Sequence, residues 1–284
     1  MTKDLGKSTK AKLLNIARAG KLDYQLIVIR FLYERLLYRL SKSVYKNKFY
    51  LKGGVLLYAM EKEYARPTLD IDFLGLGISN DLESLKQVFR VICSIDDPDT
   101  GVYFDLDTIS AEEINETKNY VGTRLSIVAY LDSIKQPLKI DIGFGDVVIP
   151  DPQLLSYESM IPGLDSTDIV AYSLETVVAE KFQAMIDLSE LNSRYKDFYD
   201  VYTILTKYPL EKQLLLSSIR ATFKNRNTPY AEGHPLFTTA FAGDKVRNQQ
   251  WKQFLKKIKV NTELEFSTVM ELLKDQLMSF YEQV

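Results

Sequence analysis

Three aspartates are the residues best suited to chemistry in this chain of 284 residues. Asp70 and Asp72 lie in the run Arg66-Pro-Thr-Leu-Asp-Ile-Asp, and Asp141 lies in the run Leu138-Lys-Ile-Asp-Ile-Gly. Side chains along a strand alternate between its two faces, so we expect Asp70 and Asp72 on the same face. Clustered carboxylates repel one another, and a divalent cation with oxygen ligands relieves that repulsion. The pattern predicts a Mg²⁺ site at these three aspartates.

Two glycines precede the first acidic pair. Gly53 and Gly54 separate the apolar run 49–51 from the helical run 55–60, which predicts a strand, a tight turn and a helix N-terminus. Backbone N–H groups at such a terminus can bind phosphate. An Asp-X-Asp pair alone is also typical of a solvated sheet edge or an acidic rim. The glycine pair before it favours a site for a metal and a phosphate.

Five blocks of the chain together resemble the abortive-infection AbiEii/AbiGii toxin nucleotidyltransferases of the polymerase-beta-like superfamily. The resemblance covers about Phe49 to Leu205, and its blocks are Lys52-Gly53-Gly54, Arg66-X-Thr68-X-Asp70-Ile-Asp72, Asp141-Ile-Gly-Phe-Gly-Asp146, Glu180-Lys181-Phe182 and Arg194-X-Lys196-Asp197-X-X-Asp200. The last two blocks are the more specific to the toxins. The superfamily often has Gly-Ser where this chain has Gly53-Gly54, so backbone amides would have to replace the hydroxyl.

The resemblance implies a fold and an activity. The fold is α/β (α+β), a nucleotidyltransferase-fold mixed sheet with flanking helices, followed by a mainly helical C-terminal domain. The activity is that of a toxin of a toxin-antitoxin or abortive-infection system. It is Mg²⁺-dependent transfer of nucleotides from an NTP to RNA, with the 3′ acceptor end of tRNA as the expected acceptor. A cognate antitoxin protein is the implied partner.

The resemblance also assigns roles to residues. Asp70, Asp72 and Asp141 are the expected metal ligands and catalytic residues. Lys181 would contact nucleotide phosphates, and Asp197 would lie in the catalytic cleft, where it orients Lys181 or accepts a proton. From the residues alone, Lys181 could instead extend to solvent or pair with an acid, and Asp197 could form a surface ion pair with a residue one turn away. The full set of expected nucleotide-binding residues is Lys52, Gly53, Gly54, Arg66, Thr68 and Lys181.

Composition agrees with a cytoplasmic enzyme. The chain is 46% hydrophobic, has a net charge of -2, and has no apolar stretch that would span a membrane. Its one cysteine, Cys93, excludes an internal disulfide framework. Charge is polarised along the chain: residues 1–62 carry 14 Lys/Arg against 4 Asp/Glu, and residues 63–190 carry 8 against 24. Basic flanks attract polyanions, unless the segments neutralise one another in the fold.

A second basic feature lies near the C-terminus. The run 245–262 has six Lys/Arg residues and no acid, around Trp251 and Phe254. Cations interleaved with aromatics are typical of nucleic-acid surfaces. We therefore expect RNA binding by Lys245, Arg247, Trp251, Lys252, Lys256 and Lys257. The alternative is a solvated helix face that docks Trp251 into the core.

The elements expected around these residues form two domains. Apolar spacing predicts helices at 23–40, 81–95, 173–185 and 197–205, strands at 102–109, 121–131 and 137–144, and a loop at 224–244. Prolines and a glycine between residues 150 and 163 suggest a boundary near residue 165. Residues 1–165 would be the nucleotidyltransferase catalytic domain with a basic helical N-terminus. Residues 166–284 would be a helical domain that completes the active site and binds the acceptor.

Other functions remain open on the sequence. One is nucleotidyl or phosphoryl transfer to a small molecule or to a protein hydroxyl. Another is a non-catalytic nucleic-acid-binding or partner-binding module that retains the fold. Three mutually repelling aspartates argue against the second, because a domain without catalysis has no need of them. The basic flanks favour RNA over a small acceptor.

Overall fold

The computed structural model describes residues 4–61, 65–117, 120–259 and 263–284. The last three residues of the basic run, 260–262, therefore lie outside the described residues. The chain divides into two compact units. Unit 1 is Met1–Gly145 with Gln153–Ala171, and unit 2 is Asp146–Pro152 with Tyr172–Val284. The division thus falls after Ala171, whereas the sequence suggested a boundary near residue 165, and one short segment, 146–152, belongs to the second unit.

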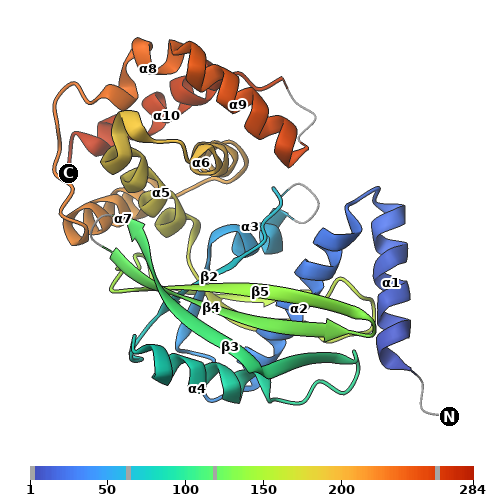
Figure 1. Ribbon diagram of the computed structural model, residues 1–284. Coiled ribbons are helices and arrows are strands. Elements are labelled where there is room, and N and C mark those ends of the chain that lie inside the picture. Colours follow the sequence, from blue (N-terminus) through green and yellow to red (C-terminus); the bar gives the residue numbers. More distant parts are fainter. Residues whose placement is uncertain (1–3, 62–64, 118–119, 260–262) are drawn as a thin grey trace. The chain divides into compact units, whose positions relative to one another are not determined.

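Unit 1 is built on a seven-stranded mixed sheet with strand order β3-β4-β5-β2-β1-β7-β6 (Figure 1). The central strand β2 pairs in parallel with β5 and antiparallel with β1. The strands are β1 (Phe49–Lys52), β2 (Ile71–Gly75), β3 (Val102–Thr117), β4 (Tyr120–Leu131), β5 (Ile134–Phe144), β6 (Gln153–Tyr157) and β7 (Thr167–Ala171). The helices of this unit are α1 (Leu5–Ala19), α2 (Tyr24–Lys42), α3 (Gly53–Glu61) and α4 (Leu82–Cys93).

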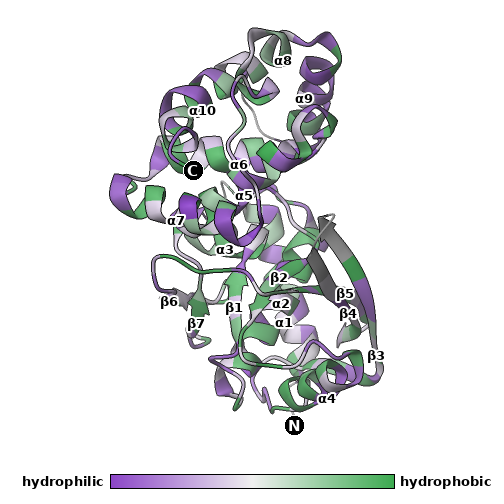
Figure 2. Cartoon of the chain, turned by 90° about the vertical axis from the view of Figure 1, so that its left-hand side faces the viewer, coloured by the Kyte–Doolittle hydropathy of each residue, from purple (hydrophilic) through white to green (hydrophobic). Residues whose placement is uncertain are grey.

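One face of this sheet is apolar and covered. Phe49 of β1 packs edge to face against Phe73 of β2, with ring centroids 5.9 Å apart, and against Phe89 of α4, at 5.3 Å. The β1–β2 register places Phe73 on the face opposite to Asp72. Helix α4 therefore covers the apolar face and leaves Asp72 on the other. Figure 2 shows β1 and β7 in the green of apolar residues.

Helix α2 is buried on nearly all sides, as its apolar content predicts. Two of its arginines have partners inside the unit: Arg35 donates to Glu34 at 2.8 Å, and Arg39 donates to the carbonyls of Cys93 and Val102 at 3.0 and 2.9 Å. Arg30 stacks on Tyr58. Three arginines of the basic N-terminal segment are therefore part of the core of unit 1 and do not contribute to a surface for polyanions.

Unit 2 is helical. It contains α5 (Leu174–Leu188), α6 (Tyr195–Lys207), α7 (Lys212–Asn225), α8 (Thr239–Gly243), α9 (Lys245–Ile258) and α10 (Phe266–Tyr281), with 3-10 turns at Ser189–Leu191 and Pro235–Phe237. The side chain of Ser173 caps α5 by accepting the N–H of Thr176 at 3.2 Å. An aromatic core holds α6, α9 and α10 together through Tyr195, Trp251 and Phe266.

The architecture confirms the expected fold class, a mixed sheet with flanking helices and a helical C-terminal part, and four details differ. Asp70 lies just before β2 and not on it. Strand β3 extends well beyond residue 109. Strands β6 and β7 were missed because each has only five residues and prolines interrupt the surrounding sequence. The expected loop at 224–244 contains a 3-10 turn and the short helix α8.

Candidate functional site

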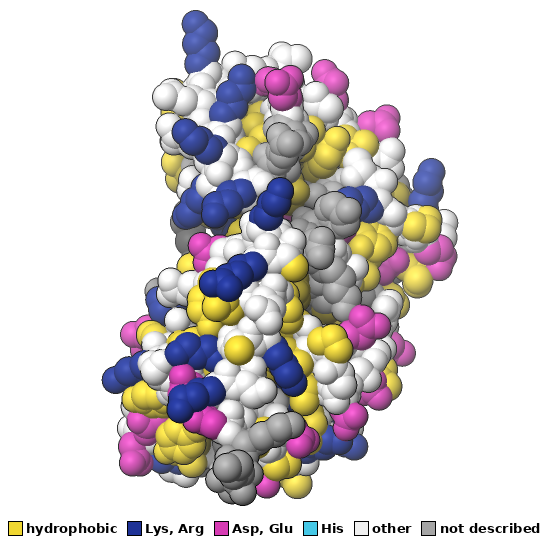
Figure 3. All heavy atoms as spheres, turned by 90° about the vertical axis from the view of Figure 1, so that its right-hand side faces the viewer, with side chains coloured by type: hydrophobic (Ala, Val, Ile, Leu, Met, Phe, Trp, Pro, Cys, Tyr) yellow, Lys and Arg dark blue, Asp and Glu magenta, His cyan; other side chains and the backbone are white. Residues whose placement is uncertain are grey.

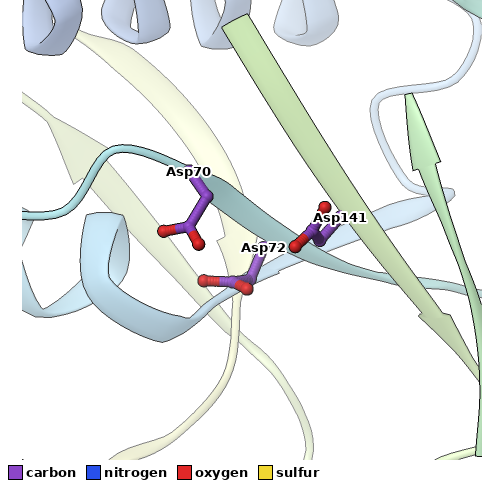
Figure 4. A group of neighbouring side chains, drawn as sticks. All are labelled: Asp70, Asp72 and Asp141. Carbon is purple, nitrogen blue, oxygen red and sulfur yellow. The ribbon is translucent and has the colours of Figure 1, made fainter. Parts of the chain in front are cut away.

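The three predicted aspartates come together in unit 1 (Figure 4). Asp72 on β2 and Asp141 on β5 are direct neighbours in the parallel register, and Asp70 immediately precedes β2. One carboxylate oxygen of each residue lies within 4.8 Å of the other two. Carboxylate oxygens are hard donors of the kind that Mg²⁺ and Mn²⁺ prefer. Asp70, Asp72 and Asp141 are therefore the residues that could hold a divalent metal.

Gly53 makes room for the carboxylate of Asp72. It is the first residue of α3, directly after β1, with a positive φ of 67°. A Cβ at this position would lie 2.0 Å from Oδ2 of Asp72 and 2.6 Å from its Cγ. No side chain fits there unless Asp72 moves. The glycine brings the backbone of the α3 N-terminus against the acid cluster, where its N–H groups can meet an anion.

Gly54 serves a different neighbour. A Cβ at this position would lie 2.8 Å from both Cβ and Oγ1 of Thr68, whose hydroxyl donates to Oδ1 of Asp70 at 2.6 Å. A serine at this position would collide with Thr68. The nearby hydroxyl belongs to Thr68, and it donates a hydrogen bond to the carboxylate of Asp70. Thr68, expected to bind nucleotide, is thus a positioning residue for an acid.

Arg124 of β4 binds the third aspartate with a two-pronged contact. Its Nε donates to Oδ1 of Asp141 at 2.8 Å, and its Nη2 donates to Oδ2 at 2.7 Å. The hydrogen bond to Asp141 is the main reason that the pKa of Arg124 is raised above its usual value. Such paired, charge-assisted hydrogen bonds fix the plane of a carboxylate. Sequence reasoning did not identify Arg124, because only strand pairing connects it with Asp141.

These residues belong to one row of charges that crosses five strands. In the pairing registers Glu112 faces Arg124, Arg124 faces Asp141, Asp141 faces Asp72, and Asp72 faces Lys52. Directly paired residues point to the same side of a sheet. The adjacent acids at the centre of the row are therefore flanked by a cation on each side. Lys52, predicted to bind nucleotide, is buried at the end of β1 in this row.

Arg66, also predicted to bind nucleotide, lies half-buried in the segment that leads to β2. One of its guanidinium nitrogens, Nη1, is 3.5 Å from the carbonyl oxygen of the next residue, Pro67. The residue therefore belongs to the same unit and the same segment as Thr68 and Asp70. That position supports the expected role without testing it.

Tyr33 of α2 ties together the two backbone segments that carry the acids. Its hydroxyl oxygen lies 2.9 Å from the carbonyl oxygens of both Leu69 and Lys139, and it accepts the N–H of Lys139 at 3.1 Å. Leu69 precedes Asp70, and Lys139 lies two residues before Asp141. Burial raises the pKa of Tyr33 well above its usual value, so the hydroxyl keeps its proton. Sequence reasoning did not identify Tyr33.

Lys181 and Asp197 form a second cluster, in unit 2. Nζ of Lys181 lies 2.7 Å from Oδ1 of Asp197 and 2.9 Å from Oδ2 of Asp200, and Nε of Arg194 lies 2.7 Å from Oδ2 of Asp197. Two acids from α6 thus hold one lysine of α5. Asp200 was part of the quoted motif but had no assigned role. A lysine in an apolar helix signals the need for such partners.

The charge of Asp197 is strongly stabilised. Burial alone would raise its pKa, but the nearby charges of Lys181 and Arg194 outweigh burial and lower the pKa to about 2. Asp197 has no exposed surface. A buried carboxylate with such a low pKa is a poor proton acceptor at neutral pH. Of the two roles left open by the sequence, orientation of Lys181 is the one that this geometry supports.

Asp146, the last acid of its motif, has a structural contact in unit 2. Nε and Nη2 of Arg226 donate to its Oδ1 at 3.1 and 2.8 Å, and Nη1 of Arg226 donates to Gln183 at 2.9 Å. These contacts attach the segment 146–152 to α5 and to the end of α7. The motif therefore combines an acid of the cluster, Asp141, with an acid that anchors a backbone segment, Asp146.

The basic run forms α9, and the structure contradicts the prediction that Trp251 binds RNA. Trp251 is fully buried, and its indole N–H donates to the carbonyl of Leu264 at 2.7 Å. Arg247 donates to the backbone carbonyls of Asn192 and Glu190 and stacks on Phe241. The Trp docks into the core because it shares an apolar stripe with Leu255. Trp251 is therefore not available to a nucleic acid, and Arg247, which is half-buried, has backbone carbonyls as partners.

The outer face of α9 keeps the character that the sequence predicted. Lys245, Lys252, Lys256 and Lys257 are exposed, although Lys252 lies 3.3 Å from Glu265. Figure 3 shows Lys and Arg side chains gathered over the part of unit 2 that carries α9. A groove of about 560 Å³ is lined there by Lys245, Asn248, Gln249, Lys252, Gln253 and Lys256. Cationic and amide groups alternate along it, without an acid.

Comparisons with known proteins show what the chain is similar to. A family model described as "Nucleotidyl transferase AbiEii toxin, Type IV TA system" matches residues 35–272. The fold is similar to that of JHP933 from Helicobacter pylori, with a TM-score of 0.52, 15% identity, and coverage of 92% of this chain and 94% of that chain. An antigenic nucleotidyltransferase-like protein from Paracoccidioides brasiliensis matches at TM-score 0.42 and 12% identity, over 70% of this chain and 88% of that chain.

Two further findings complete the comparisons. Among curated proteins, none matches this chain significantly. Within the described residues, no helix has the length and apolar character needed to cross a membrane.

Proposed function

Since the chain belongs to the family of AbiEii nucleotidyl transferase toxins of type IV toxin-antitoxin systems, we propose that it transfers nucleotides from an NTP to RNA, with the 3′ acceptor end of tRNA as the acceptor. The observation that carries the proposal is the cluster of Asp70, Asp72 and Asp141, whose ligand oxygens lie within 4.8 Å of one another. An antitoxin follows from the family. Its neutralising action lets a cell tolerate the enzyme.

In this proposal the acid cluster holds Mg²⁺. When bound, Mg²⁺ screens the triphosphate and stabilises the charge that develops at phosphorus. The acceptor hydroxyl oxygen forms a bond to the α-phosphorus, the bond to the pyrophosphate oxygen breaks, and the hydroxyl proton passes to Asp141. Backbone N–H groups at the N-terminus of α3 bind phosphate oxygens, and Gly53 permits their close approach.

Unit 2 would supply the remaining contacts. Lys181, held by Asp197 and Asp200, presents a fixed positive charge for phosphates. The four exposed lysines of α9 would attract the RNA backbone, because each phosphate that they neutralise releases counterions. On this proposal unit 1 is the catalytic domain, and unit 2 completes the site and holds the acceptor.

The test is a transfer assay. Purified protein is incubated with Mg²⁺, with each NTP labelled at the α-phosphate in turn, and with total tRNA, and the RNA is resolved on a denaturing gel. We expect labelled tRNA with the wild type and none with Asp72→Asn. Asp107→Asn is the matched control, because it removes an exposed acid of unit 1 outside the cluster and should leave labelling unchanged.

The other readings predict different patterns of label. Transfer to a protein hydroxyl places the label on protein, and transfer to a small molecule places it on neither macromolecule. A binding module without catalysis leaves every acceptor unlabelled while it still retains tRNA. Any of these outcomes, with an intact fold by circular dichroism, would overturn the RNA acceptor. Labelling by Asp72→Asn at the wild-type rate would overturn the metal site.

A further inference from the structure

We propose that Arg124 has two successive partners: it is the counter-charge of Asp141 while the acid cluster is empty, and it binds a phosphate of the nucleotide once the cluster is loaded. The proposal rests on the proposed function, because it assumes a nucleotide and a metal at this site. It adds a substrate-binding residue that lies outside the five motif blocks, on β4.

The contacts of Arg124 leave part of its guanidinium available. Nε and Nη2 are used by Asp141, and Nη1 has no hydrogen-bond partner among the described residues. The side chain of Arg124 is 29% exposed, whereas that of Asp141 is 9% exposed. The guanidinium therefore sits at the open side of the ion pair. A guanidinium is a planar fork of donors that matches a phosphate as well as a carboxylate.

The charge row explains the first role. Asp72 and Asp141 are adjacent like charges, and no cation of the chain stands between them in the row. With the site empty, Arg124 on one side offsets part of their repulsion. A positive charge so close to the acids also repels an incoming Mg²⁺. The ion pair should therefore make the empty site a weak binder of free metal.

The second role follows from what a metal and a nucleotide bring. A divalent cation shared by the aspartates draws charge from Asp141 and weakens its hold on Arg124. A triphosphate at the same time adds anionic oxygens to the site. Arg124 can then exchange one anionic partner for another without leaving a buried charge unpaired. Metal and nucleotide should consequently bind with positive coupling, through this residue.

Metal titration separates the two roles. Mn²⁺ binding to the full chain is measured by electron paramagnetic resonance, without nucleotide and with a nonhydrolysable NTP, and binding of that NTP is measured by calorimetry. For Arg124→Gln we expect free Mn²⁺ to bind about tenfold more tightly, because a unit positive charge near the ion is removed. We expect the NTP to bind about tenfold more weakly, because a charged hydrogen bond to phosphate is lost.

Two controls accompany the measurement. Arg90→Gln removes the same charge from an arginine that is 37% exposed and lies 3.9 Å from Asp107, and it should change neither affinity. Arg124→Lys keeps the charge but loses the fork, so free Mn²⁺ should bind as in the wild type while NTP binding falls. If Arg124→Gln fails to fold, Arg124→Lys still tests the contact with phosphate through its NTP affinity.

The shifts in opposite directions are the signature of the proposal. If Arg124→Gln weakens both Mn²⁺ and NTP, Arg124 only organises Asp141, and the proposal is wrong. If free Mn²⁺ binds more tightly and NTP affinity is unchanged, the phosphate role is wrong. The Mn²⁺ measurement without nucleotide needs neither NTP nor RNA. A wild-type protein that shows the coupling but labels no RNA would refute the acceptor and leave this inference standing.

Discussion

Substitution of Gly53 by alanine should disable the metal site while it leaves the fold intact. The alanine Cβ would lie 2.0 Å from Oδ2 of Asp72, more than 1 Å inside an ordinary contact. To remove this clash, Asp72 or the start of α3 must move by about 1 Å. Because metal-oxygen bonds of Mg²⁺ are about 2.1 Å long and tolerate little error, a displacement of that size removes Asp72 from coordination.

The effect on stability should be modest by comparison. A left-handed backbone costs alanine about 1–2 kcal/mol, and the reduced freedom of the unfolded chain returns about 0.4–1 kcal/mol. Gly163→Ala is the matched control: it has a positive φ of 89° in unit 1, and a Cβ there would meet nothing within 4 Å. Both variants should lose a few degrees in Tm, about 2–4 °C per kcal/mol.

The two variants should differ in metal binding. We expect Gly53→Ala to lose at least about tenfold in Mn²⁺ affinity, since removal of even an outer partner of a ligand costs 10- to 100-fold. Gly163→Ala should bind Mn²⁺ as the wild type does. Calorimetry measures the affinities and circular dichroism the melting. Equal Mn²⁺ affinity in both variants, within twofold, would refute the reasoning that Gly53 exists to admit Asp72.

Three further perturbations test other parts of the structure. Tyr33→Phe should weaken Mn²⁺ binding several-fold, whereas Tyr157→Phe, at another buried tyrosine of unit 1, should change only Tm. Asp197 has a folded pKa of about 2, below its unfolded value, so it contributes about 2 kcal/mol above pH 4 that is lost as pH falls toward 2. Acid unfolding of Asp197→Asn should therefore show a shallower decline of stability over that range. The double variant Lys252→Gln, Lys256→Gln should weaken tRNA binding and flatten its salt dependence, while NTP affinity stays the same. An unchanged salt dependence of tRNA binding would show that α9 does not bind the RNA.

The sequence predicted what depends on local pattern. The apolar spacing of 23–40 and 173–185 predicted the helices observed as α2 and α5, and alternation around Asp72 and Asp141 predicted the strands that carry them. Both acids then meet because β2 and β5 are parallel neighbours. The sequence also predicted the order of β1, glycine turn and α3. At Gly53 the structure adds the reason for the glycine, since a Cβ there would lie 2.0 Å from Oδ2 of Asp72.

What the sequence could not predict depends on pairing between distant strands. Arg124 lies 17 residues before Asp141, and only the antiparallel register of β4 and β5 makes them partners. Tyr33 lies 106 residues before Lys139 in the chain, and only the packing of α2 on the sheet brings its hydroxyl to that backbone. Trp251 was the avoidable error: with Leu255 and Ile258 it follows helical spacing, which indicated that this face of α9 is buried.

The pairing of β4 with β5 also bears on how the sheet finds its alignment during folding. Side chains repeat with a period of two, so a slip of two residues keeps every apolar side chain facing the core. One such slip would place Arg124 opposite Lys139 in place of Asp141. Like charges directly opposite each other destabilise a strand pair. The Arg124–Asp141 ion pair therefore disfavours a two-residue slip between β4 and β5 that the pattern of apolar side chains would allow.

Between β5 and β2 the same rule works against the functional alignment. A slip of two residues would bring Lys139 beside Asp72, an attractive pair, whereas the observed register sets Asp141 beside Asp72. The charges of these two strands therefore favour the wrong partner. Tyr33 opposes that choice, because its hydroxyl is bonded to the backbone of Lys139 and lies within reach of Leu69. Through Tyr33, helix α2 therefore stabilises the observed register of β2 and β5, which the charged side chains of these two strands do not favour.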